Sequence, residues 1–549
     1  MIHVRTRSTF GYLFNLNHKR IACHESYTER SAQYEVILNE LNYKNLPRMK
    51  KSIMLAALIA LVTFTSCEKN ENDLPEVRAS NLTPHKIGPD RMNPYEISNM
   101  QVAFDRVSSE FGLPSTSLSP NSAYIEVQLQ DEDDEELLAD DLSINTFDYP
   151  PHRDIVLEGD YSDWNPYNVC DTCVTPKYVT VDLNHSLPSG LVLDTLDMVY
   201  FPDEDPSWSS LLSESTIEDF YYRMEEEAYN LAGVHFGEQS SGKTSLLNRW
   251  TPNGNIKYYD KEINSPDSVK LEGMRIVVNK GIKSSRAYTD SNGDFTMTKK
   301  FSGKVRYKIQ FKGDHFVLRN KVGKNQVVST RKKGSWNKVI TDQKDLYQAI
   351  TYRAVYHYYN FDILNLERPY TSGNRIKIFL YPSLGSSIKG NVPPNKNGRK
   401  IELYTETYNV ETMTYVAFHE MQHSVQGRVS GLLSALDVYS AETLATGVET
   451  FLTRKYYPDY ENLTVISATP GATGVEIMTG GYTGLVQDLV DNDNSQEDYC
   501  NGFELDKIEA DFHSSSPVTW NNWRDEIIAN RSTNPTVNKV SDLFAAWKM

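Results

Sequence analysis

Two histidines and a glutamate between positions 419 and 423 have residue types and a spacing that could do chemistry. The segment His419-Glu420-Met421-Gln422-His423 has the pattern H-E-x-x-H. On a helix, residues four apart stand on one face, so both imidazoles could bind one Zn²⁺ while Glu420 faces a metal-bound water. Zinc makes that water a hydroxide source near neutral pH, and the glutamate could carry its proton. The alternative is a helix that carries two histidines by chance.

The flanking sequence predicts a helix around this motif and two strands before it. Residues 412–426 contain neither Gly nor Pro, and Gly427 is expected to end the helix. Residues 375–381 and 400–404 alternate between apolar and polar side chains, as strands do. We expect this strand pair to lead into the motif helix, and the strand at 400–404 to offer an edge to an extended peptide.

A third metal ligand is predicted on the next helix. Apolar residues recur at spacings of three and four between positions 438 and 452, which predicts an amphipathic helix. Glu442 lies beside this apolar stripe, after the eighteen residues 424–441 that follow His423. A carboxylate buried there needs a cationic partner. A metal ion shared with the histidines is the economical partner.

The pattern HExxH, eighteen residues and Glu resembles the gluzincin metallopeptidases, in which the third ligand is a glutamate on the next helix. The resemblance covers residues 340–549. It implies a peptide or protein substrate, a zinc ion bound by His419, His423 and Glu442, and Glu420 as the general base.

Two positions depart from the thermolysin-like gluzincins. Ala441 precedes the ligand glutamate where those enzymes have Asn, and Thr446 stands one turn after it where they have an acid. Glu449, two turns along the same face, could serve behind a ligand histidine, or it could be a surface acid. Zinc hydrolysis also needs a donor for the oxyanion, and Tyr482 and His513 are the candidates.

Composition and charge limit the classes of protein to be considered. The chain has 549 residues, 39% of them hydrophobic, which leaves room for two to four globular domains. Its net charge of −17 argues against nucleic acid as the main partner. Five cysteines are too few for a disulfide framework, and the C-x-x-C at 170–173 is expected to form a local disulfide.

An apolar segment at 53–64 has the length of a signal-peptide core and is too short to span a bilayer. Together with Phe64-Thr65-Ser66-Cys67 it resembles a bacterial lipoprotein signal, with Cys67 as the lipidated residue. This implies an envelope protein, an outer-membrane lipoprotein facing the periplasm or the cell surface and held by its lipid. Met49 is then the expected start, with residues 1–48 as a gene-model extension. The alternatives are an ordinary secretory peptide or a buried apolar helix.

Short alternating segments between residues 251 and 330 predict a β-rich domain. Asn292-Gly293 within residues 290–294 predicts a hairpin turn, since this pair adopts positive φ at little cost. Residues 271–274 and 289–295 resemble the carboxypeptidase regulatory-like, transthyretin-type β-sandwich. Such modules pack or bind and seldom catalyse.

A rival motif occurs at 237–244, where G-x-x-x-x-G-K-T satisfies the P-loop formula. A working P-loop needs a buried strand before it and a helix after it. The preceding residues are interrupted by Gly233 and His235, and Pro252 and Gly254 follow within two turns. We therefore expect a polar linker here, with no nucleotide partner.

The sequence as a whole predicts a multidomain α+β protein that ends in a mainly helical, zincin-like domain. The competing interpretation is a catalytically inactive surface lipoprotein that binds glycan or protein, which the missing acid at Thr446 leaves open. The predicted parts are an extension (1–48), a signal peptide (49–66), a tether (67–93), a small α/β module (94–250), the β-sandwich (251–335) and the metallopeptidase domain (336–549).

Overall fold

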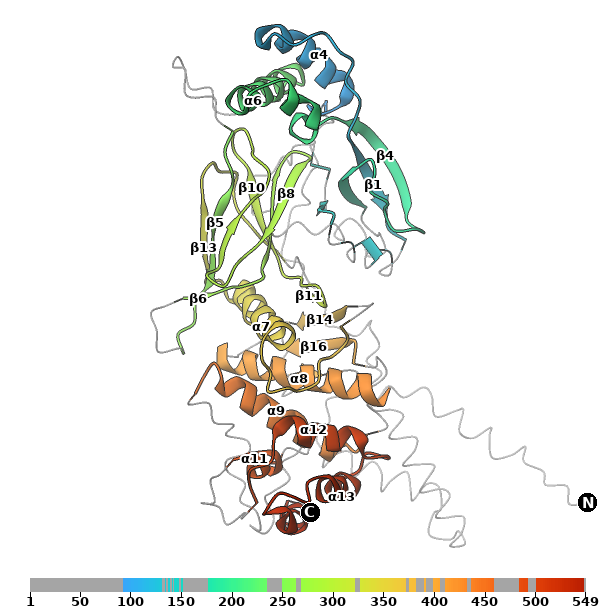
Figure 1. Ribbon diagram of the computed structural model, residues 1–549, viewed down its shortest axis with the longest axis vertical. Coiled ribbons are helices and arrows are strands. Elements are labelled where there is room, and N and C mark those ends of the chain that lie inside the picture. Colours follow the sequence, from blue (N-terminus) through green and yellow to red (C-terminus); the bar gives the residue numbers. More distant parts are fainter. Residues whose placement is uncertain are drawn as a thin grey trace, which may run out of the picture. The chain divides into compact units, whose positions relative to one another are not determined.

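The computed structural model shows a mixed α and β structure, with four sheets among the described residues, all in one compact unit of the chain (Figure 1). None of the described helices is long and apolar enough to cross a membrane. Cys67, the C-x-x-C at 170–173, the P-loop match at 237–244 and Tyr482 lie outside the described residues. The structure describes residues 92–130, 134, 137–138, 141, 143–147, 150–151, 176–234, 249–262, 268–320, 326–371, 375–381, 390–391, 398–404, 410–431, 436–458, 483–491 and 500–547.

The N-terminal module combines two helices with an antiparallel sheet of order β2-β3-β1-β4. Met100, Phe104 and Val107 recur at helical spacing on α4 and are buried in one core with Phe220 and Met224 of α6. This region therefore contains both helices and strands. Their bounds are α4 (Ile97–Val107), β1 (Ser122–Gln128), β2 (Thr146–Phe147), β3 (Lys177–Asp182), β4 (Val192–Val199) and α6 (Glu214–Leu231).

Two sheets follow, one of order β12-β10-β7-β8 and one of order β13-β5-β6, with β9 also paired to β5. Tyr307 of the first sheet lies 5.3 Å from Trp336 and 6.0 Å from Phe295 of the second, measured between ring centroids. The two inner faces therefore share one core, as in a sandwich. The strands are β5 (Asn253–Tyr258), β6 (Val269–Lys270), β7 (Arg275–Lys280), β8 (Lys283–Tyr288), β9 (Asp294–Thr296), β10 (Arg306–Gln310), β12 (Gln326–Val328) and β13 (Trp336–Ile340).

The turn predicted at 290–294 forms, but it does not join paired strands. Gly293 has φ +76°, and Asp290 and Asp294 are joined by a backbone hydrogen bond of 2.9 Å. However, β8 pairs with β7 and β9 pairs with β5. The turn thus carries the chain from one sheet to the other, so the prediction of a hairpin was wrong. The local sequence determines the turn, whereas packing between the two sheets determines which strands pair.

Two strand pairs cross position 335, the predicted boundary between the β-sandwich and the C-terminal domain. β11 (Phe316–Asn320) pairs in parallel with β14 (Ile376–Tyr381), whereas β13 pairs in parallel with β5 of the sandwich. One hydrophobic core also runs from Tyr258 in the sandwich to Trp547 near the C-terminus. The sandwich and the C-terminal region are therefore packed as one body.

The sheet nearest the motif helix has the order β11-β14-β16-β15, and the predicted strands at 375–381 and 400–404 form β14 and β16. β16 (Lys400–Tyr404) is parallel to β14, so the chain must return between them, and part of that return forms β15 (Gly390–Asn391), antiparallel to β16. Among the described residues the edge strands of this sheet are consequently β11 and β15, and β15 pairs with Glu402 and Leu403 of β16. The expectation that 400–404 forms the edge was wrong.

Helices make up most of the remaining residues that the structure describes in the C-terminal region. α8 packs against α7, α9, β15 and β16 (Figure 1), which places the motif helix between the sheet and a second layer of helices. The helices are α7 (Gln343–Asn360), α8 (Val410–Ser430), α9 (Val438–Arg454), α11 (Leu485–Val490), α12 (Leu505–Ser514), α13 (Trp520–Asn530) and α14 (Val540–Ala546).

Candidate metal centre

α8 carries the motif as predicted, but it continues past Gly427 to Ser430. Gly427 is buried where α8 packs among its neighbours, and that packing outweighs the modest helix penalty of about 1 kcal/mol for glycine. His419, Glu420 and His423 are buried, with exposed fractions of 6%, 4% and 8%. Metal-binding groups at these positions would work in a site largely shielded from water.

The turn before β16 fixes α8 next to the second histidine. Gly398 has φ +74°, and a Cβ there would lie 2.5 Å from the carbonyl oxygen of Ser424. The Ser424 hydroxyl in turn donates a hydrogen bond to the carbonyl oxygen of Gly398. Only glycine accommodates both the backbone angle and the approach, so this residue sets the distance between sheet and helix beside His423.

α9 presents Glu442 to the two histidines. The side chain of Asp437 caps this helix by accepting a hydrogen bond from the Ser440 N–H, 3.1 Å away. Of the predicted stripe, Ala441, Ala445, Val448 and Leu452 are buried, whereas Val438, the first residue of the helix, is exposed and was wrongly assigned to the buried face. The Glu442 side chain keeps 22% of its surface exposed and reaches both imidazoles.

Three donor atoms meet at one point between α8 and α9. His419 Nε2 lies 3.1 Å from His423 Nε2 and 3.0 Å from Glu442 Oε2, and the remaining His423–Glu442 distance is 3.3 Å. A tetrahedral zinc ion with its usual bond lengths needs neighbouring ligand atoms about 3.3 to 3.5 Å apart. The observed triangle agrees with that requirement to within about 0.4 Å. The described part of the chain contains no other group of three His, Cys, Asp or Glu side chains with this arrangement.

Each histidine is held from behind through its other ring nitrogen. Glu449 Oε2 lies 2.8 Å from His419 Nδ1, and Gln426 Oε1 lies 2.8 Å from His423 Nδ1. Oxygens there hold the proton on Nδ1 and leave the Nε2 lone pair for a metal ion. Glu449 is only 4% exposed, so of the two interpretations the structure supports the carboxylate behind a ligand histidine.

Sequence reasoning missed Gln426, although its position three residues after His423 on the same helix could have revealed it. The Gln426 amide also donates a hydrogen bond of 2.9 Å to the carbonyl oxygen of Ala441, which precedes Glu442. One side chain thus links the second histidine to the helix that bears the third ligand.

The charges of the cluster favour a cation at its centre. Burial lowers the pKa of His419, but hydrogen bonds to Glu442 and Glu449 outweigh it and raise that pKa well above its usual value. Burial raises the pKa of Glu442, but the charge of His423 and hydrogen bonds from both histidines bring it below its usual range. The site therefore stabilises positive charge, as protons or as a metal ion.

Glu420 follows the first ligand histidine and has the properties of an acid–base group. Its Oε2 is buried without a hydrogen-bond partner among the described residues. Burial raises the pKa of this carboxyl to about 7, against the lowering effect of His423 and His419. A carboxyl that titrates near neutral pH can both accept and return a proton.

His513 lies on α12, where its Nε2 is 3.8 Å from Glu509 Oε1. The same oxygen of Glu509 accepts a 2.8 Å hydrogen bond from Gln422 of the motif. The structure thus brings together His419, His423 and Glu442 and connects His513 to the motif helix only through Glu509 and Gln422. Its role as oxyanion donor stays a prediction.

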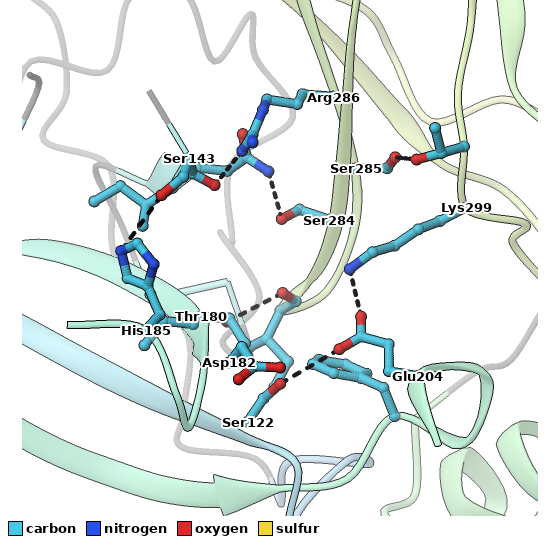
Figure 2. Close-up of a pocket in the computed structure, with 16 residues that line it drawn as sticks. Ser122, Ser143, Thr180, Asp182, His185, Glu204, Ser284, Ser285, Arg286 and Lys299 are labelled. Atoms are coloured by element: carbon cyan, nitrogen blue, oxygen red, sulfur yellow. Dashed lines mark hydrogen bonds and ion pairs between the residues drawn. The ribbon is translucent and has the colours of Figure 1, made fainter. Parts of the chain in front are cut away.

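Figure 2 shows a cavity of about 430 Å³ whose described lining comes from the N-terminal module and the sandwich. Two of its lining side chains already have polar partners: Lys299 forms an ion pair with Glu204, and His185 lies 2.6 Å from Asp141. None of the three candidate ligands lines it. The cavity is therefore separate from the metal centre.

No protein-family model matches the chain, and a search of curated proteins found no significant match either.

Proposed function

We propose that this chain is a zinc-dependent peptidase of the gluzincin type, which hydrolyses peptide bonds. The observation that carries the proposal is the convergence of His419 Nε2, His423 Nε2 and Glu442 Oε2 within 3.3 Å of one another. Two neutral imidazoles and one carboxylate are the donor set of catalytic zinc sites that keep a position open for substrate or water. The buried Glu420 one residue after His419 adds the base that this class of reaction needs.

His419, His423 and Glu442 would hold the ion. Zinc bound there would acidify a water molecule and polarise the carbonyl group of the scissile bond. Glu420 would take the proton from the attacking water and deliver it to the departing amine nitrogen, a task suited to a carboxyl whose pKa is about 7. Glu449 and Gln426 would keep both imidazoles in the ligand tautomer throughout.

The nearby sheet edge supports a polypeptide substrate. β15 is one of the two outer strands of this sheet among the described residues, and it contacts α8. An extended peptide that adds to such an edge makes main-chain hydrogen bonds whatever its side chains. This arrangement would bring a substrate backbone alongside the motif helix.

We also propose that the protein is located in the cell envelope and carries a lipid on Cys67. A chain acylated at Cys67 should partition into detergent, whereas Cys67→Ala should remain in the aqueous phase. Recovery of wild-type protein in the aqueous phase without a lipid mass would remove this part of the proposal and leave the chemistry untouched.

Metal analysis combined with peptide cleavage tests the function. The purified wild-type protein should bind one zinc ion and cleave peptides from a mixed library, with loss of both after chelation and return of both on adding zinc. Glu442→Ala should lose zinc, while Val438→Ala, at an exposed position of the same helix, should keep it. A wild-type protein that binds zinc but cleaves no peptide would favour the inactive binding protein instead.

A further inference from the structure

A short segment of the sandwich contacts the first turn of α8 and the chain just beyond the end of α9, the two helices that carry the candidate ligands. It follows β5 and comprises residues 260–262. Glu262 Oε2 accepts a 2.8 Å hydrogen bond from the backbone N–H of Glu411, in the first turn of α8. The first four N–H groups of a helix lack partners within the helix, and a carboxylate there also meets the positive end of the helix dipole. A residue 149 positions away in the chain thus caps the motif helix.

Asp260 connects the same segment to the residues that follow the other ligand helix. Its Oδ1 accepts a 3.0 Å hydrogen bond from the N–H of Glu262, and its Oδ2 accepts a 2.8 Å hydrogen bond from the hydroxyl of Tyr457. Tyr457 lies three residues beyond the end of α9. Asp260 is 2% exposed and Tyr457 is 6% exposed, so water cannot readily replace the hydrogen bond between them.

The position of this segment matters because the metal centre is divided between the two helices. α8 supplies both histidines and α9 supplies Glu442. Their donor atoms must remain within a few tenths of an ångström of the observed 3.0–3.3 Å separations for one ion to reach all three. Glu411 lies two turns before His419, about 12 Å along the helix axis. A shift at the start of α8 therefore moves the histidines relative to Glu442.

We propose that Asp260 and Glu262 are positioning residues for the metal centre, which makes the β-sandwich a structural part of the site. The inference rests on the proposed function, because it assigns these residues a task in holding the zinc ligands. It departs from the expectation of a module that only packs or binds. The core shared between the sandwich and the C-terminal helices supports this view independently of the two carboxylates.

Zinc affinity measured by competition with a chelating dye tests the inference. Glu262→Ala should weaken zinc binding by about tenfold, the lower end of what loss of a supporting group costs. Glu262→Gln keeps an oxygen acceptor for the Glu411 N–H and should restore affinity to within about twofold of wild type, a recovery that a requirement for charge alone would not give. Glu272→Ala, at a partly exposed glutamate of the same sandwich, is the matched control and should bind like wild type.

Tyr457→Phe deletes one hydroxyl and provides a second variant in case Glu262→Ala does not fold. It should weaken zinc binding several-fold, whereas wild-type affinity in a folded Glu262→Ala or Tyr457→Phe protein would overturn the inference. Hydrogen exchange of the Glu411 amide in zinc-free protein separates this inference from the proposed function. Faster exchange in Glu262→Ala would support the contact even if the wild type bound no zinc, and unchanged exchange would refute it.

Discussion

Replacement of Glu449 examines whether the metal site extends beyond its three ligands. Its Oε2 lies 2.8 Å from His419 Nδ1, and the residue is 4% exposed, so solvent screens the contact little. A hydrogen bond to a charged group contributes about 1.5–3 kcal/mol. At about 1.4 kcal/mol for each factor of ten in affinity, this corresponds to a loss of roughly 10- to 100-fold, which agrees with the known cost of removing outer-shell partners.

The two possible replacements of Glu449 should differ. Glu449→Gln keeps an oxygen for the Nδ1 proton and loses only the charge, so zinc affinity should fall about tenfold. Glu449→Ala loses both the oxygen and the charge, and its zinc affinity should fall by close to 100-fold. Titration of zinc into metal-free protein against a chelating dye measures both values, with Glu442→Ala as the reference for loss of a direct ligand. Wild-type affinity in a folded Glu449→Ala protein, or a greater loss there than in Glu442→Ala, would refute this division of roles.

Two further predictions concern the scaffold. Gly398→Ala should destabilise the protein by about 2 kcal/mol or more and weaken zinc binding, because its Cβ would meet the Ser424 backbone next to His423. The control is Gly112→Ala, where φ is +66° and the space around the glycine is open. Equal zinc affinities in the two variants would contradict this role of Gly398. Burial lowers the pKa of Lys280 to about 7. Between pH 7 and about 10.5 the unfolded chain therefore binds a proton at Lys280 that the folded chain does not. The free energy of unfolding consequently increases as the pH rises through this range. Lys280→Met should therefore raise the melting temperature more at pH 6 than at pH 9, and an equal rise at both would contradict a buried lysine.

The helices of the metal centre could be predicted from the sequence because local signals specify them. The H-E-x-x-H spacing and the lack of Gly and Pro predict α8, and the apolar stripe from 438 to 452 predicts α9. Position on that stripe also directs Glu442 toward the core, and the structure brings it to His419 and His423. Only the end of α8 was misplaced, because burial of Gly427 depends on neighbours that the local sequence does not reveal.

What could not be predicted depends on contacts distant in the chain. β11 pairs with β14, and β13 with β5, in parallel. Parallel strands are not joined by a short turn, so no local sequence signal predicts these pairs. The cap that Glu262 places on α8 joins residues 149 positions apart. Similarly, Glu449 could be a surface acid or a partner of His419 until the tilt between α8 and α9 is known. These features arise from packing between elements, which the pattern within each element leaves open.

The most direct test of the central claim is the Glu420→Gln variant, measured for zinc content and for peptide hydrolysis on the same sample. The substitution preserves the shape of the side chain and removes no candidate ligand. We predict that the variant binds zinc like the wild type and loses hydrolysis by at least about 100-fold, the lower end of what a general base contributes. Wild-type turnover in a zinc-loaded Glu420→Gln protein would contradict the proposed mechanism.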